Sequence, residues 1–349
     1  MTLNLYFREG RPSLFIFIVF MKIILDCVIL IDVLTQIERK SMKKLSIVVP
    51  CYNEQETIYP FLEETQKIET KMKDQLIFDY IFVNDGSKDE TLKVLRDIAS
   101  RFENVHYLSF SRNFGKEAGL LAGLEAADGD FITVMDADLQ DPPELLIEMY
   151  QKINEGYDVV GTRRADRKGE PVIRSFFSKM FYKIINAVSD TEMVDGARDF
   201  RLMTRQVVDS ILELGEVNRF SKGIFSWIGF NVTYIAYENR ERVAGETSWS
   251  FWSLFKYSME GFINFSEAPL NLSLWTGSVS FLASILGILF IIIRKLTVGG
   301  SVSGWASLVC IILFIGGIQL LALGIIGKYI SKIFLETKKR PVYIVKEKG

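Results

Sequence analysis

The stretch FITVMDADLQDPP, residues 131–143, decides the fold. Its first five residues are apolar or β-branched and predict a buried strand at Phe131–Met135. Two acids, Asp136 and Asp138, follow this strand at once. Because residues two apart share a face of an extended chain, we expect both carboxylates to approach one oxygen-preferring cation. In the alternative interpretation, these acids only cap the next helix, a task for which Asp141 alone would be enough.

Four further β-rich runs lie on either side of this stretch, separated by segments of helical length. They predict strands at Leu45–Val49, Phe78–Val83, Val105–Ser109 and Asp158–Gly161. Near-continuous apolar strands that alternate with helices indicate right-handed βαβ units, and so an α/β domain with a mainly parallel sheet. Such sheets bind ligands at the carboxyl ends of their strands. The unusual polar residues fall at those ends, in Pro50–Glu54, Asn84–Asp89, Ser111–Glu117 and Asp136–Pro143.

The C-terminal third has a different composition, which indicates a membrane. Ala268–Ile293 and Leu296–Gly327 contain no charged residue, and each run exceeds the roughly 20 residues that cross a bilayer as a helix. Several cations follow the second run, so the positive-inside rule predicts that both long flanks are cytoplasmic. The net charge of −2 gives no reason to expect a nucleic acid partner. The three cysteines are too scattered to indicate a disulfide framework or a zinc site.

The remaining segments complete a predicted domain plan. An aromatic and lysine-containing stretch, Trp249–Phe265, favours the membrane interface, although a core-facing helix is the alternative. The first residues are apolar but interrupted by charges, so either the true start lies near Met42 or an extra membrane segment precedes it. The plan is an N-terminal extension (1–41), a catalytic domain (42–245), an interfacial segment (246–267), two membrane helices (268–330) and a basic cytosolic tail (331–349).

The loops after the first two predicted strands favour a nucleotide pocket. Pro50, Tyr52, Asn53 and Glu54 supply a rigid turn, an aromatic surface and polar groups, while Asp85 supplies an acceptor for a base or a ribose. Neither a Walker loop nor Gly-x-Gly-x-x-Gly occurs, which argues against a kinase or a dehydrogenase. The single histidine lies away from these motifs, so a histidine-based mechanism is not expected.

Taken in order, these motifs resemble those of family 2 glycosyltransferases. The segments that carry the resemblance are IVVP and YNE (47–54), NDGS (84–87), SRNFGKE (111–117), DADLQDPP (136–143) and DFRL (199–202). More narrowly, the chain from about Leu45 onwards resembles bacterial polyprenyl-phosphate glycosyltransferases of the bactoprenol glucosyltransferase type, relatives of dolichol-phosphate mannose synthase. Residues 245–249, GETSW, depart from that pattern because they lack a lysine.

The resemblance implies a GT-A fold, an inverting reaction, a UDP-sugar donor and a Mg²⁺ or Mn²⁺ ion. On the donor side it places Pro50, Tyr52, Asn53, Glu54, Asp85 and Lys116, together with Asp136 and Gln140. It gives Asp136, Asp138 and Gln140 as the metal positions.

On the acceptor side the resemblance places Asp199 next to the nucleophile. A phosphate monoester has a second pKa near 6 and is largely dianionic at neutral pH, so we expect Asp199 to orient the substrates or Arg201 rather than to remove a proton. Arg174, Arg201, Arg240 and Arg242 are the candidates for binding the acceptor phosphate.

The function predicted from the sequence is transfer of a sugar, with glucose favoured, to undecaprenyl phosphate for modification of a cell-envelope glycan. The predicted setting is the bacterial plasma membrane, with several spans and a cytoplasmic catalytic domain. A homo-oligomer such as a tetramer and a flippase partner are further expectations. A processive polysaccharide synthase is one alternative, but the chain has no Gln-x-x-Arg-Trp motif. A non-catalytic sensor of nucleotide sugars is the other, against which the retained acids argue.

Overall fold

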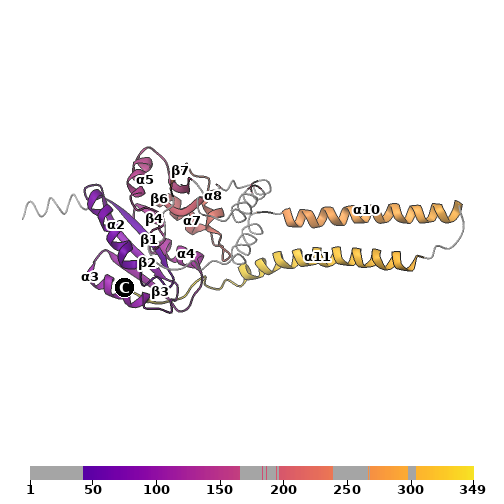
Figure 1. The fold of residues 1–349 in the computed structure, drawn as a ribbon, viewed down its shortest axis with the longest axis horizontal. Helices are drawn as coiled ribbons and strands as arrows, with labels where there is room; N and C mark the ends of the chain where they lie inside the picture. Colours follow the sequence, from indigo (N-terminus) through magenta and orange to yellow (C-terminus); the bar gives the residue numbers. More distant parts are fainter. Residues whose placement is uncertain are drawn as a thin grey trace, which may run out of the picture.

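The structure of the chain is a computed structural model, and it describes residues 42–165, 183, 186, 194, 196–238, 266, 268–297 and 304–349. Within these ranges it contains an α/β domain and two long C-terminal helices (Figure 1).

The domain is built on one eight-stranded sheet with the order β7-β5-β6-β4-β1-β2-β3-β8. The strands are β1 (Lys43–Cys51), β2 (Leu76–Asn84), β3 (Val105–Phe110), β4 (Phe131–Val134), β5 (Val159–Arg164), β6 (Ala197–Thr204), β7 (Val232–Tyr237) and β8 (Val345–Lys348). Strands β4, β1, β2 and β3 pair in parallel, and so do β5 and β7. Strand β6 is antiparallel to both of its neighbours, and β8 is antiparallel to β3.

Helices cover both faces of the sheet, because its central strands are apolar on both sides. They are α2 (Ile58–Met72), α3 (Thr91–Arg101), α4 (Lys116–Ala126), α5 (Leu145–Asn154), α7 (Arg205–Glu213) and α8 (Ser221–Trp227). Phe61, Leu95 and Met149 bring α2, α3 and α5 onto one face. Leu120 and Val207 bring α4 and α7 onto the other. The carboxyl ends of the parallel strands are therefore held between two packed layers.

The two long helices, α10 (Ala268–Thr297) and α11 (Trp305–Thr337), run side by side in opposite directions away from the domain (Figure 1). Their candidate spans, Ala268–Arg294 and Phe314–Thr337, are long and apolar enough to cross a membrane by length and composition. Large apolar side chains such as Trp275 and Leu321 are exposed along them. Exposing this apolar surface to water would raise the free energy of the protein, so the surface favours a lipid environment.

The chain returns from α11 to the α/β domain. Residues 331–349, expected as a basic tail, form the last turns of α11 and then β8, which extends the sheet beside β3. Tyr343 stacks on Phe110 with ring centroids 4.9 Å apart, and Glu347 pairs with Arg96 at 2.6 Å. The last residues of the chain therefore belong to the sheet of the α/β domain.

The mostly parallel mixed sheet and the two apolar helices confirm the predicted fold class, a GT-A type α/β domain with a helical C-terminal part. The five predicted strands are present, most of them longer than expected because the ladders continue into the polar ends. Strand β6 was not predicted as a strand. The predicted interfacial segment, 246–267, lies outside the described residues except for Ser266.

Candidate active site

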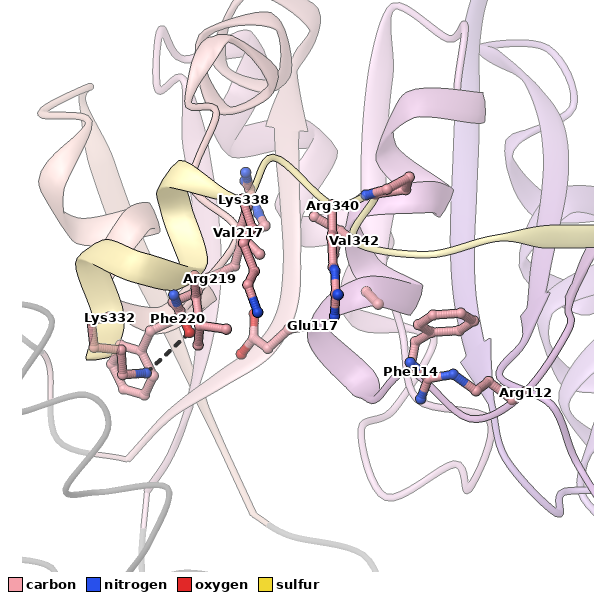
Figure 2. Close-up of a pocket in the computed structure, with 14 residues that line it drawn as sticks. Arg112, Phe114, Glu117, Val217, Arg219, Phe220, Lys332, Lys338, Arg340 and Val342 are labelled. Atoms are coloured by element: carbon pink, nitrogen blue, oxygen red, sulfur yellow. Dashed lines mark hydrogen bonds between the residues drawn. The ribbon is translucent and has the colours of Figure 1, made fainter. Parts of the chain in front are cut away.

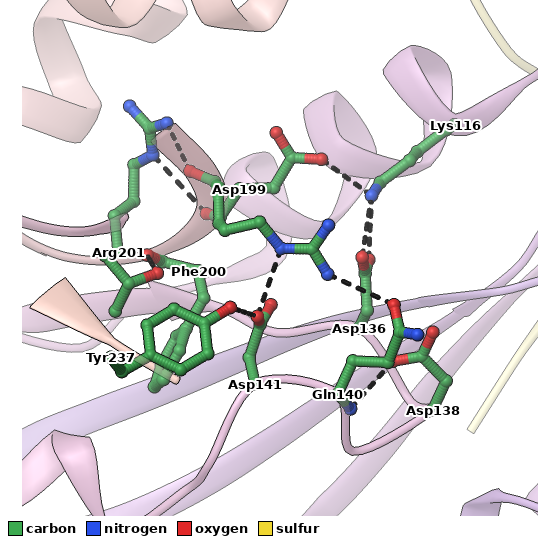
Figure 3. A network of polar contacts seen from close by, with 11 residues as sticks. Lys116, Asp136, Asp138, Gln140, Asp141, Asp199, Phe200, Arg201 and Tyr237 are labelled. Atoms are coloured by element: carbon green, nitrogen blue, oxygen red, sulfur yellow. Dashed lines mark hydrogen bonds and ion pairs between the residues drawn. The ribbon is translucent and has the colours of Figure 1, made fainter. Parts of the chain in front are cut away.

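The pairing of β4 with β6 brings two acids together at the sheet edge. Val134 pairs with Arg201 in this antiparallel ladder, so continuing the register by two residues sets Asp136 opposite Asp199. Lys116, the first residue of α4, lies between their carboxylates (Figure 3). Its Nζ is 2.8 Å from Asp136 Oδ1 and 2.7 Å from Asp199 Oδ2. We call these three residues the carboxylate cluster.

The charges of the carboxylate cluster stabilise one another. Burial alone would raise the pKa of Asp199, but Lys116, Lys222 and Arg201 hold it far below its usual range. Burial alone would lower the pKa of Lys116, but Asp136 and Asp199 raise it well above its usual range. Asp199 is therefore an anion and Lys116 a cation throughout the physiological pH range. Sequence reasoning missed Lys222, which follows the first residue of α8 and belongs to no recognised motif.

The turn after β4 has a strained backbone. Leu139 has φ +56°, which a branched side chain rarely adopts, yet its side chain is buried. Buried Asp138 accepts a hydrogen bond from the backbone N–H of Gln140 at 3.1 Å. Such strain persists only where the surroundings impose it, and it clusters at functional sites.

Asp141 does not cap the following helix. Its carboxylate accepts a bond from the Tyr237 hydroxyl and pairs with Arg198 Nε at 3.1 Å, while α5 begins after Glu144. Arg198 also donates to Gln140 Oε1 at 3.3 Å (Figure 3). Arg198 and Tyr237 were not among the predicted site residues. The only sequence signal for Arg198 was its place directly before Asp199, and Tyr237 had none.

Asp85 anchors the loop that carries Lys116. Its two carboxylate oxygens accept the backbone N–H groups of Phe114 and Gly115 at 2.6 and 2.8 Å. Burial raises the pKa of Asp85, opposed by these two bonds and by Arg112. Gly86 must be glycine, because its φ is +63° and a Cβ would lie 2.3 Å from the carbonyl carbon of Arg112.

The loops after β1 and β2 are joined by hydrogen bonds. Asn53, at φ +57°, accepts the backbone N–H of Lys88 at 2.9 Å and donates its own to Ser87 Oγ at 3.0 Å. Glu54 accepts a bond from Thr57 Oγ1 at 2.7 Å. Tyr52 remains 39% exposed on this double loop, as expected for an aromatic platform.

The predicted acceptor arginines are only partly described. Arg174, Arg240 and Arg242 lie outside the described residues. Arg201 is buried, with its guanidinium 3.7 Å from the Phe225 ring centroid, and it donates to the backbone carbonyl of Arg198 at 2.9 Å. Its guanidinium points away from the carboxylate cluster (Figure 3). Arg201 Nε also donates to the backbone carbonyl of Asp199 at 3.4 Å, and its positive charge helps to lower the pKa of the Asp199 carboxylate.

The side chains after β4 fit a divalent cation in part. Two carboxylates match the donor set that Mg²⁺ uses when water and phosphate oxygens complete its shell, so Asp136 and Asp138 suit it. The described residues contain no group of three or more His, Cys, Asp or Glu side chains that could hold a metal ion. Gln140 fits less well, because its side-chain oxygen already accepts from Arg198. A metal at Asp136 would also compete with Lys116.

Comparisons with known proteins show the family of the chain. A sequence model of the family described as "Glycosyl transferase family 2" matches residues 46–212. The chain is 48% identical over 305 residues to CsbB of Bacillus subtilis (strain 168), with 87% of this chain and 91% of that protein covered. It is 40% identical over 308 residues to bactoprenol glucosyl transferase of Shigella phage SfII, with 87% and 98% covered. Among solved structures, mannosyl-3-phosphoglycerate synthase from Rubrobacter xylanophilus superposes with a TM-score of 0.44 at 15% identity, over 64% of this chain and 72% of that one.

Proposed function

The chain belongs to glycosyl transferase family 2 and is a glycosyltransferase, and from that premise we propose that it transfers one sugar from a UDP-sugar to undecaprenyl phosphate. Glucose is the proposed sugar. In support, the bactoprenol glucosyl transferase of Shigella phage SfII aligns with this chain over 98% of its length. The product would be a polyprenyl-phosphate-linked monosaccharide for modification of a cell-envelope glycan.

The observation that carries the proposal is that one chain combines the carboxylate cluster with two apolar helices that are not buried in the structure. Lys116, Asp136 and Asp199 gather charges of both signs at the sheet edge where ligands of α/β domains bind. The end of α11 contacts the same domain, because Glu336 accepts the backbone N–H of Val217 at 3.1 Å, and the chain then continues into β8. A polar site next to a membrane anchor suits an acceptor whose phosphate is in water while its isoprenoid chain stays in lipid.

On the donor side, Asp136 and Asp138 would hold a Mg²⁺ or Mn²⁺ ion. When bound, the ion supplies positive charge that neutralises the departing diphosphate. Lys116 is the chain's own cation at this position, and it is placed to contact a diphosphate once it leaves Asp136. Asp85 has two proposed roles. It holds the backbone just before Lys116 by hydrogen bonds, and it contacts the uridine of the donor.

On the acceptor side, a phosphate oxygen would attack the anomeric carbon of the sugar as the bond to the diphosphate breaks, with inversion. This nucleophile is largely dianionic at neutral pH and needs no base. Asp199 is a poor base in any case, because the surrounding cations hold its pKa far below the usual range. Its proposed task is to orient the sugar and to fix Lys116, while the acceptor phosphate binds to the predicted arginines.

For the membrane setting, we propose that α10 and α11 cross the bacterial plasma membrane and that the catalytic domain is cytoplasmic. The support is the series of cations that follows the second candidate span, among them Lys338 and Arg340. Assembly into a homo-oligomer and association with a flippase remain predictions.

The test is sugar transfer by the purified full-length protein in neutral detergent. Radiolabelled UDP-glucose and undecaprenyl phosphate should give an organic-soluble glycolipid, EDTA should abolish it, and added Mg²⁺ or Mn²⁺ should restore it. A panel of other UDP-sugars identifies the donor. If no metal-dependent glycolipid forms with any member of the panel, the proposed function is wrong.

A further inference from the structure

A cavity of about 400 Å³ lies where α11 meets the catalytic domain (Figure 2). Its walls come from the loop before α4 with the first turn of that helix, the segment before α8, and the end of α11 with the residues that follow it. Neither the carboxylate cluster nor Asp138 lines it. The cavity is therefore separate from the candidate active site.

The lining of this cavity is strongly cationic. Its basic side chains are Arg112, Arg219, Lys332, Lys338 and Arg340. The one carboxylate among the described lining residues is Glu117, which accepts bonds from the backbone N–H and the hydroxyl of Ser221. Such an excess of positive charge around a partly open cavity attracts an anion.

Three of these cations have no acidic partner at ion-pair distance among the described residues: Arg112, Lys338 and Arg340. Arg112 lies 4.1 Å from the centroid of the Phe114 ring, and Lys338 lies 4.1 Å from that of Phe334. Stacking on an aromatic ring orients a cation without neutralising it. Arg112 also donates one N–H to the backbone carbonyl of Asn113 at 3.1 Å, which leaves its other N–H groups, with Lys338 and Arg340, to contact a phosphate group.

The position of the cavity along α11 indicates a ligand from the membrane. The candidate span Phe314–Thr337 ends at the cavity, Lys332 and Leu335 belong to its last turns, and Lys338 and Arg340 follow directly. If the span crosses the bilayer, the cavity lies at the depth of the head groups. Basic pockets beside membrane helices bind anionic head groups there, and about 400 Å³ is enough for a small polar ligand.

We propose that this cavity binds the head group of an anionic phospholipid, with Arg112, Lys338 and Arg340 contacting its phosphate. The occupant differs from the sugar acceptor, whose phosphate we propose to bind to the predicted arginines beside the carboxylate cluster. Arg112 and Lys338 come from segments more than 200 residues apart in the chain. A bound lipid would therefore hold the catalytic domain against the membrane surface by bridging it to the end of α11.

The experiment uses the full-length protein in neutral detergent, titrated by calorimetry with dihexanoylphosphatidylglycerol below its micelle concentration. We expect saturable binding that dihexanoylphosphatidylcholine does not reproduce. Arg340→Gln and Arg112→Gln should each weaken binding roughly tenfold, the value of one charge-assisted hydrogen bond. Lys339→Gln is the matched control, because Lys339 adjoins Arg340 in the chain but does not line the cavity. We expect it to change binding less than about twofold.

Several outcomes would overturn the proposal. Equal weakening by Lys339→Gln would mean that the general charge of the segment attracts the lipid. Equally tight binding of inorganic phosphate would mean that the site takes a free anion. Competition by farnesyl phosphate, with the same sensitivity to Arg340→Gln, would mean that the cavity is the acceptor site. Sugar transfer is measured on the same variants. A failure of lipid binding can therefore be distinguished from a failure of the proposed function.

Discussion

Replacing Lys116 by methionine should tighten the binding of Mn²⁺ in the absence of the donor while it abolishes sugar transfer. Lys116 contacts the Asp136 carboxylate at 2.8 and 3.0 Å, and Asp136 is the first of the proposed metal ligands. Any cation that binds Asp136 must displace this ammonium group. The variant removes the competitor and leaves the acids of the site with one more net negative charge.

The magnitude follows from the geometry. At an effective dielectric constant of about 20, two charges 2.8 Å apart attract by roughly 6 kcal/mol. The Lys116 side chain is 35% exposed, so screening and desolvation cancel most of this. The net contribution of a charge-assisted hydrogen bond is about 1.5 kcal/mol. Removing this competing bond should therefore raise the affinity of the variant for Mn²⁺ about tenfold.

The assay is titration of Mn²⁺ followed by electron paramagnetic resonance, in which only the free ion gives a strong signal. Lys88→Met is the matched control, because it removes one exposed lysine from the neighbouring loop after β2 and should leave the affinity within about twofold. Transfer by Lys116→Met should fall at least about 100-fold, since a cation aimed at the leaving group is lost. An unchanged or weaker affinity for Mn²⁺ would refute the competition at Asp136.

Three other predictions concern neighbouring residues. Because Asp199 and Lys116 keep their charges, kcat/KM should be constant from about pH 7 to 9 and fall only below about pH 6, where the acceptor phosphate gains a proton. An increase in kcat/KM between about pH 7 and 9 would instead show a titrating base. Gly86→Ala should destabilise the fold by about 2–3 kcal/mol in thermal melts, against about 1 kcal/mol for Gly156→Ala, which has a positive φ but open space around it. Arg198→Gln should lower the free energy of unfolding by about 3–5 kcal/mol, because it leaves the buried Asp141 carboxylate without its cation. Arg198→Lys should recover part of that loss, and equal melting temperatures for the two variants would contradict this.

Local sequence patterns were sufficient to predict the central sheet and the ends where the site lies. Apolar runs such as Phe78–Val83 identify buried strands without any knowledge of the fold, and their polar successors mark the carboxyl ends. The two charge-free runs likewise predicted α10 and α11 by length alone. These features depend on neighbours in the chain, which is the information that a single sequence contains.

The features that the sequence did not reveal depend on distant partners. Strand β6 has mixed polarity, ARDFRLMT, and becomes a strand because it fits between β4 and β5. Strand β8 reads VKEK, a pattern that predicts no strand, and it forms on the free edge of β3. The bridging position of Lys116 and the bonds from Arg198 and Tyr237 to Asp141 follow from this long-range pairing. No local pattern encodes them.

The shared use of Lys116 separates the roles of the two acids that it bridges. One ammonium group cannot stay on both carboxylates and also bind an incoming diphosphate, so donor binding must draw it away from at least one of them. Asp199 keeps Lys222 and Arg201 nearby when this happens, and it therefore stays ionised. Asp136 has no second cation in ion-pair contact among the described residues, so its carboxylate becomes available to the metal. Under the proposed function, the same movement would prepare Asp136 as a metal ligand and leave Asp199 as a fixed anion, which agrees with an acceptor that arrives already charged.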